Sequence, residues 1–154
     1  MEYTLYGKLY STDITELDLS LKMLTYIDLN IKYFVNLKTL YLRNNKIKEI
    51  PKEIKYLTQL KTIDLSCNKI KEIPKEIGNL TQLQTLDLSC NEIKEILKEI
   101  GYLTQIQTLC LFNNQIIEIP KEIQYLTQLK EIHLYNNQIK EIHLYNNQIK
   151  EIPK

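Results

Sequence analysis

The sequence predicts an α/β solenoid, in which short parallel strands form a sheet on one side and short helical or irregular turns form the opposite side. Three observations predict it: a pattern that recurs every 23 residues, an alternation of apolar and polar residues within each copy, and a proline-led segment that returns the chain. Fixed periods of this length are typical of solenoids, because a single unit cannot cover its own apolar face. The fold should therefore depend on the stacking of neighbouring units.

The repeat is regular in spacing and in content. Each copy follows the pattern LxxLxLxxNxIxxIPxxIxxLxx with few departures, and the copy at residues 60–82 is followed in register by one that begins at Leu83. Matched apolar positions in successive copies are therefore expected to lie above one another. Six copies begin at Ile14, Leu37, Leu60, Leu83, Ile106 and Leu129.

The first half of each copy predicts a short strand. Apolar residues alternate with polar ones there, which is the period-2 pattern of a strand that has one face in the core. Neighbouring strands of this kind are expected to form one parallel sheet. The alternating apolar pairs are Leu40 and Leu42, Ile63 and Leu65, Leu86 and Leu88, Leu109 and Leu111, and Ile132 and Leu134.

The second half of each copy returns the chain on the other side of the core. Pro51, Pro74 and Pro120 open it in three copies, and the fixed φ of proline suits the first residue of a short helical turn. Ile54 and Leu57 are three residues apart, so such a turn directs both inward. Each unit therefore supplies apolar groups to the core from two sides.

One asparagine recurs just after each strand and has two interpretations. It could form a polar row for binding, or an inward ladder whose amides satisfy the backbone at a tight bend. The ladder is favoured, because a bend buried between coils leaves N–H and C=O groups without strand partners. Lys22 takes this place in the first unit, which indicates an end coil with an open side. The predicted ladder comprises Asn45, Asn68, Asn91, Asn114 and Asn137.

These motifs resemble the leucine-rich-repeat family. The similarity is to its 23-residue class with an IPxxI motif, which occurs in bacterial, giant-virus and amoebal proteins and in Ras-suppressor and Scribble-like scaffolds. Residues 12–137 carry the resemblance. It implies a right-handed superhelix whose parallel sheet is concave and binds other proteins and whose turns lie on the convex side, although the fold alone hosts many roles.

The two ends depart from the repeat. Residues 1–13 are expected to form a minimal cap over the first coil, and residues 14–142 form the repeat domain. Residues 131–140 are copied without change at 141–150, so residues 143–154 are expected to be a partial repeat with a frayed end. Ile142 can be the return-side isoleucine of one coil or the first strand residue of another. The apolar cap residues are Tyr3, Leu5, Tyr6, Leu9 and Tyr10.

The predicted concave face is the candidate binding surface. In a strand of the form LxxLxLxxN the third, fifth and seventh positions point away from the core. Large aromatic and charged residues at these places tend to anchor interfaces, and Phe112 stands out because an exposed phenylalanine has no evident structural task on a sheet. Alternatively, such side chains simply suit exposed strands. The predicted partner-binding residues are Tyr41, Arg43, Asp64, Asp87, Cys110, Phe112, His133 and Tyr135.

Composition argues against several classes of partner and location. A net charge of +1 from 20 basic and 19 acidic residues gives no electrostatic footprint for nucleic acid or an anionic membrane. Residues 1–8 lack the basic start and apolar stretch of a secretory signal, so we expect a cytoplasmic protein, or one in the host cytoplasm if it is viral or an effector. The three cysteines are expected to be free thiols.

Nothing in the sequence indicates catalysis, a metal or a cofactor. The phosphate-binding GxxxxGK, hydrolase GxSxG and zinc-protease HExxH motifs do not occur. His133 and His143 each lie two residues after a glutamate, Glu131 and Glu141, but the ten-residue duplication explains that pattern without a metal. We therefore expect a protein without enzymatic activity.

Three functions fit these observations. The favoured one is a monomeric module that binds a protein partner on the concave sheet. The second is a regulatory or inhibitory subunit of a signalling enzyme, which differs only in what its partner does. The third is a truncated family fragment without a selected partner, which the ten-residue duplication suggests. Edge-to-edge self-association is an alternative to the monomer.

Overall fold

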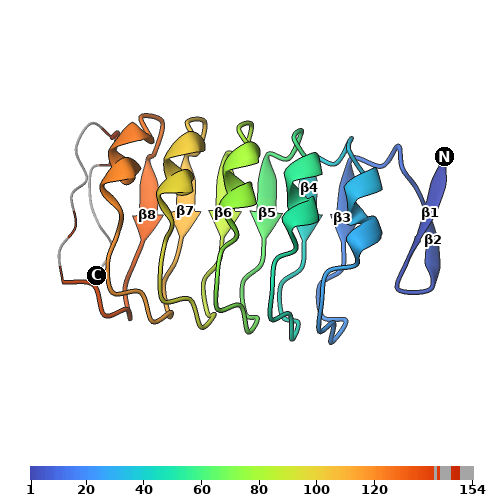
Figure 1. Ribbon diagram of the computed structural model, residues 1–154, viewed down its shortest axis with the longest axis horizontal. Helices are drawn as coiled ribbons and strands as arrows, with labels where there is room; N and C mark the ends of the chain where they lie inside the picture. The colour runs from blue at the N-terminus through green and yellow to red at the C-terminus, as the bar shows by residue number, and fades with distance from the viewer. Residues whose placement is uncertain (141, 143–146, 150–154) are drawn as a thin grey trace.

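The computed structural model describes residues 1–140, 142 and 147–149, and it confirms the predicted solenoid (Figure 1). Figure 1 shows coils stacked side by side from the N-terminal hairpin onward, with the helices in front of the strands. The hairpin pairs β1 (Glu2–Leu5) with β2 (Lys8–Ser11). The described residues then form one parallel sheet, in the order β3 (Glu16–Asp18), β4 (Thr39–Tyr41), β5 (Thr62–Asp64), β6 (Thr85–Asp87), β7 (Thr108–Cys110) and β8 (Glu131–His133).

Short 3-10 helices take the place of the predicted helical turns. Each spans five residues, begins after an extended residue and packs against the equivalent helix of the next coil. No helix in the described part of the chain is long and apolar enough to cross a membrane. The helices are η1 (Leu29–Tyr33), η2 (Lys52–Tyr56), η3 (Lys75–Asn79), η4 (Lys98–Tyr102) and η5 (Lys121–Tyr125).

The strands pair in the register that the 23-residue period predicts. Leu86 of β6 lies opposite Ile63 of β5 and Leu109 of β7, and the same offset holds at every junction from β3 to β8. Hydrogen bonds continue this register beyond the assigned strands, since the Leu65 N–H donates to the Asp87 carbonyl at 2.8 Å. Neighbouring coils are therefore fixed to each other along most of the inner side of the repeat.

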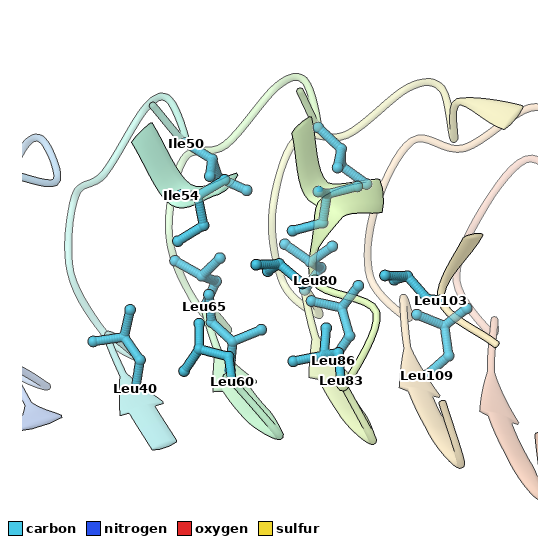
Figure 2. Close-up of a cluster of buried hydrophobic side chains, with 14 of the residues drawn as sticks. Leu40, Ile50, Ile54, Leu60, Leu65, Leu80, Leu83, Leu86, Leu103 and Leu109 are labelled. Atoms are coloured by element: carbon cyan, nitrogen blue, oxygen red, sulfur yellow. The ribbon is translucent and has the colours of Figure 1, made fainter. Parts of the chain in front are cut away.

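The core is a continuous column of leucine and isoleucine (Figure 2). Figure 2 shows Leu40 and Leu65 from the sheet side and Ile54 from the helical side pointing into the same interior. These residues are fully buried, as are Leu86 and Leu109 in later coils. Burial of each such side chain contributes roughly 1.5–3 kcal/mol, so the column supplies most of the driving force for stacking.

The prolines lie one residue earlier than predicted. Pro51 precedes η2 with an extended backbone, φ −70 and ψ 151, and its carbonyl accepts the first helical hydrogen bond, from the N–H of Ile54 at 3.0 Å. The expectation that it is the first helical residue is therefore wrong. A φ near −65° suits either position, so the ring alone does not decide between them. Leu97 replaces proline before η4 with nearly the same angles, φ −73 and ψ 152.

The asparagines form a hydrogen-bonded column between coils. The side-chain N–H groups of Asn91 donate to the carbonyls of Leu88, in its own coil, and Leu65, in the preceding one. Its Oδ1 accepts from the backbone N–H of Ile70, also in the preceding coil, at 2.9 Å. Asn45 does the same for the first unit, where Lys22 and Leu24 donate to its Oδ1. The other members with this pattern are Asn68, Asn114 and Asn137.

The N-terminal hairpin packs against the first coil. Leu5 is fully buried in the shared core, and Tyr3 stacks on Tyr33 of η1 with ring centroids 3.8 Å apart. The Tyr6 hydroxyl donates to the Tyr26 carbonyl at 2.8 Å, and burial raises the pKa of Tyr6 to about 12. Leu9 is 57% exposed, because it lies on the outer side of the hairpin, so its predicted role in covering the core is wrong.

The first copy of the ten-residue duplication continues the regular register, since Glu131–His133 forms β8. Ile139 and Ile142 pack partly buried against the core, and the backbone N–H of Gln148 donates to the Leu129 carbonyl at 2.9 Å. Residues 141, 143–146 and 150–154 lie outside the described residues. The predicted frayed segment 143–154 therefore falls largely on residues that the structure does not describe.

Each bend places one residue in the left-handed backbone region, immediately before the ladder asparagine. Asn44, Asn113 and Asn136 occupy this site in three coils, but Cys67 and Cys90 occupy it in the middle coils, all with φ of 53 or 54. Asparagine tolerates this region, whereas other side chains with a Cβ are strained there by about 1 kcal/mol. The middle coils therefore carry a small, avoidable strain.

Removing a central ladder residue should destabilise the fold. We expect Asn91→Ala to lower the free energy of unfolding by about 1–3 kcal/mol, because the Ile70 N–H and the Leu65 carbonyl lose a buried partner. Urea denaturation followed by circular dichroism measures the change. Asn79→Ala is the matched control, since Asn79 is exposed at the end of η3 and should change stability by less than about 0.5 kcal/mol. Equal losses in the two variants would contradict the ladder's role.

Relieving the strain at a bend should stabilise the fold. We expect Cys90→Asn to raise the free energy of unfolding by about 0.5–1 kcal/mol, because asparagine is less strained than cysteine at φ 53. Asn113 also offers an amide that already lies 3.4 Å from the Cys90 sulfur. The reciprocal variant, Asn113→Cys, should lose a similar amount in the same urea titration. A gain in both variants, or a loss in both, would disprove this account.

Candidate functional site

The candidate site is the sheet face, which we define as the residues that alternate with the buried strand residues and point away from the core. Each coil contributes three of them, held in rows by the strand register. Most are exposed or half-buried. They are Glu16, Asp18 and Ser20; Thr39, Tyr41 and Arg43; Thr62, Asp64 and Ser66; Thr85, Asp87 and Ser89; Thr108, Cys110 and Phe112; and Glu131, His133 and Tyr135.

The aromatic residues of the last two coils stack on each other. The rings of Phe112 and Tyr135 are 4.5 Å apart between centroids and nearly parallel, with an interplanar angle of 12°. The carbonyl of Phe112 accepts from the Cys90 N–H at 2.9 Å, and that of Tyr135 accepts from the Asn113 N–H at 3.0 Å. Phe112 is partly buried and has a structural contact, the stacking between coils, that its sequence position alone does not predict.

Two aspartates stand side by side in the middle of the sheet face. Asp64 and Asp87 are register partners on β5 and β6. One oxygen of each is occupied, since Oδ1 of Asp87 accepts from the N–H of Ser89 at 2.9 Å and from its hydroxyl at 2.6 Å, and Ser66 bonds Asp64 in the same way. Among the described residues no donor reaches the Oδ2 atoms. The carboxylates are thus fixed in place and retain an acceptor each.

The N-terminal part of the sheet face carries a different pair. Tyr41 is half-buried and Arg43 exposed, both in the coil of β4. Hydrogen bonding from Ser20, with a smaller contribution from Arg43, lowers the pKa of Asp18. This pair lies three strand steps, about 14 Å, from Phe112. The predicted partner-binding residues therefore extend across the sheet in two rows, with Asp64 and Asp87 between the two ends, rather than forming one cluster.

His133 does not assemble a metal site with the residues that the structure describes. Its Nε2 lies 3.9 Å from Oε2 of Glu131 on the same strand, and the other candidate, His143, lies outside the described residues. No group of three or more His, Cys, Asp or Glu side chains within the described ranges has the spacing to hold a metal ion. His133 instead borders the stacked aromatic pair, since it lies next to Cys110 in the register.

Cys110 experiences a negative electrostatic environment. Burial raises the pKa of its thiol to about 12, and Asp87, Glu131 and Asp64 add to the increase through their charges. The pKa of Cys67 is also raised by burial and by its neighbours, Asp87 and Asp64 among them. Carboxylates from three coils therefore act together on this part of the sheet face.

A row of exposed tyrosines on the helical side was not among the predicted functional residues. They recur at or near the ends of the 3-10 helices, and the ring of Tyr102 lies so close to Gly78 that a Cβ there would be 2.9 Å from it. The 23-residue period could have revealed them, because they occupy one repeat position: Tyr33, Tyr56, Tyr102 and Tyr125. A shallow groove there is lined by Gly78, Asn79, Thr81, Gly101, Tyr102, Thr104, Gln124, Tyr125 and Thr127.

Comparison with protein families gives two matches. A family described as "Leucine-rich repeat region" matches residues 65–152, which is more than half of the chain, and one described as "Leucine rich repeat" matches residues 35–93. No curated protein matches the sequence.

Solved structures of repeat proteins are similar to this chain. A Leptospira interrogans LRR protein is 34% identical with a TM-score of 0.75 over 92% of this chain and 40% of its own. The plant peptide hormone receptor RGFR1, solved in complex with RGF2, is 35% identical with a TM-score of 0.77, over 83% of this chain and 22% of the receptor chain. An internalin from Listeria monocytogenes is 27% identical with a TM-score of 0.68, over 74% of this chain and 32% of the internalin chain. The chain thus spans less than half the length of these three structures.

The thiol of Cys110 should be unusually unreactive. In a Cys67→Ser and Cys90→Ser background, we expect iodoacetamide at about pH 8 to alkylate it roughly a thousandfold more slowly than free cysteine, because a thiol with a pKa of about 12 is almost wholly protonated. Mass spectrometry over time gives the rate. Adding Asp87→Asn should accelerate the reaction by removing one carboxylate that raises the pKa. A folded chain that reacts as fast as the urea-denatured one would contradict this result.

Proposed function

Because this chain belongs to the leucine-rich-repeat family, we propose that it is a non-catalytic module that binds a protein or peptide partner on the concave face of its sheet. Domains of this family generally mediate protein–protein interactions. The observation that carries the proposal is the aromatic pair, Phe112 and Tyr135, held on the outward face of two adjacent strands beside His133. Aromatic groups fixed at the centre of a contact are the residues that contribute most to binding energy.

The rigidity of the site supports this function. The backbone of both aromatic residues is hydrogen-bonded to the preceding coil, and the coils share one buried core. A partner therefore meets side chains that are already in place, so little conformational entropy is lost when it binds. An interaction surface of this kind needs no moving part.

Complexes formed by similar proteins support a proteinaceous partner. The receptor RGFR1 was solved in complex with RGF2, and the ectodomain of the Arabidopsis thaliana receptor kinase GASSHO1/SCHENGEN3, 32% identical over 74% of this chain and 14% of its own with a TM-score of 0.70, in complex with CASPARIAN STRIP INTEGRITY FACTOR 2. We extend to this chain only the kind of partner.

Removing the large side chains of the sheet face should abolish partner binding. We expect a tagged triple variant, Arg43→Ala, Phe112→Ala and Tyr135→Ala, to retain at least about tenfold less partner than the wild type, since anchor residues commonly contribute 2 kcal/mol or more each. Quantitative mass spectrometry of proteins that co-purify with the chain measures this retention.

The helical side offers a matched control with the same residue classes. Lys55→Ala, Tyr102→Ala and Tyr125→Ala also remove two aromatic rings and one cation, but from the opposite side of each coil. This control should retain the partner, and circular dichroism should show that both variants fold. If the wild type retains no more of any protein than the sheet-face variant, the proposed function is wrong.

A further inference from the structure

Charge is distributed unequally between the sheet face and the remainder of the chain. Five carboxylates and one guanidinium occupy the outward positions, so the face carries a formal charge of −4, whereas the whole chain carries +1. The carboxylates are those of Glu16, Asp18, Asp64, Asp87 and Glu131. A partner that approaches this face is therefore selected by its charge, because complementary potentials favour encounter and like charges oppose it.

The negative charge is least compensated near β6. The coil of β5 carries Lys61 and Lys69 at the two ends of its strand segment, but the coil of β6 carries Gln84 and Glu92 at the equivalent places. The free Oδ2 of Asp87 therefore has no lysine from its own coil beside it. Asp64 lies directly opposite in the register, so two like charges stand on adjacent strands about 4.8 Å apart.

The aromatic pair adjoins this negative region. Cys110 lies between the negative region and the aromatic pair, because its register partners are Asp87 on one side and His133 on the other. Phe112 follows Cys110 by two residues on the same face. Asp87, Asp64 and Glu131 all raise the pKa of the Cys110 thiol, which shows that their charges reach this point of the sheet. The carboxylates of Asp64 and Asp87 and the aromatic rings of Phe112 and Tyr135 are thus neighbours on one rigid surface.

We propose that the sheet face between β5 and β8 binds an extended basic peptide segment, with a Lys or Arg side chain over Asp64 and Asp87 and an apolar or aromatic side chain against Phe112 and Tyr135. This inference rests on the proposed function and specifies its partner. A guanidinium or ammonium between the two carboxylates relieves their repulsion and uses the Oδ2 acceptors that the chain itself leaves free.

The geometry sets the spacing within the peptide. Two strand steps, about 10 Å, separate β6 from β8, and an extended chain advances about 3.3 Å per residue. Side chains of an extended segment alternate between its two faces, so only an even separation directs both toward the sheet. The basic and apolar side chains should therefore be two or four positions apart. Acidic segments are disfavoured here, since they would place like charges over Asp87 and Glu131.

Selection from a phage-displayed library of random peptides on the full chain tests the chemistry without assuming a sequence. We expect selected peptides to combine Lys or Arg with an aromatic or large aliphatic residue two or four positions away. Synthetic copies are then titrated by fluorescence anisotropy. Asp64→Asn with Asp87→Asn should weaken binding about tenfold or more, and should flatten its dependence on salt. Asparagine keeps the oxygen that accepts from Ser66 or Ser89, so the variant should fold.

Glu49→Gln with Glu72→Gln is the matched control. It removes the same charge from two exposed residues one repeat apart outside the sheet face, and should change the affinity less than about twofold. Selected peptides that are acidic or uncharged, or that bind the aspartate variant as well as the wild type, would overturn the inference.

The outcomes also separate this inference from the proposed function. Peptides of another chemistry that bind the wild type but not the Phe112→Ala, Tyr135→Ala variant would uphold a binding face and refute the basic partner. Failure to select any peptide that depends on these two rings would refute both. Self-association of the chain that Asp64→Asn and Asp87→Asn abolish would assign the face to a second copy, and would also overturn the peptide proposal.

Discussion

The structure depends on the fact that each coil completes the coil before it. The asparagine side chain of one unit accepts a hydrogen bond from a backbone N–H of the preceding unit and donates one to a carbonyl there, as Asn91 does with Ile70 and Leu65. The buried leucine column also requires neighbouring coils, because the apolar side chains of one coil are covered by those of the next. Polar and apolar requirements therefore enforce one offset, 23 residues, and a coil that slipped by a single position would lose both.

That constraint explains which parts could be predicted from sequence. The alternation of Leu40, Tyr41 and Leu42 requires a strand with one buried face, and copies in register require parallel pairing, so the sheet, its register and the inward asparagines followed from residue type and spacing alone. The resemblance to a known family added the curvature of the sheet. These features recur from copy to copy, so a residue pattern that would be ambiguous in one copy predicts the structure when it occurs in several.

The features that escaped prediction occur once or depend on neighbouring coils. Stacking of Phe112 on Tyr135 requires knowing that the two side chains turn toward each other, which residue identity does not determine. Pro51 fits the residue before a helix as well as the first residue in it, so its φ could not decide the boundary. Leu9 is apolar but faces outward, because only one side of the hairpin can touch the first coil.

The division between core and sheet face also explains where specificity can arise. Leu86, Leu88 and Asn91 are held by packing and hydrogen bonds, so change there costs stability. The alternating outward positions lie outside the apolar core, and it is there that Cys110 and Phe112 replace the Asp and Ser of the middle coils. A solenoid can thus vary its binding chemistry one coil at a time while its core stays constant. In this chain that variation places an aromatic pair beside a fixed pair of carboxylates, so two different chemical groups lie next to each other on one rigid surface.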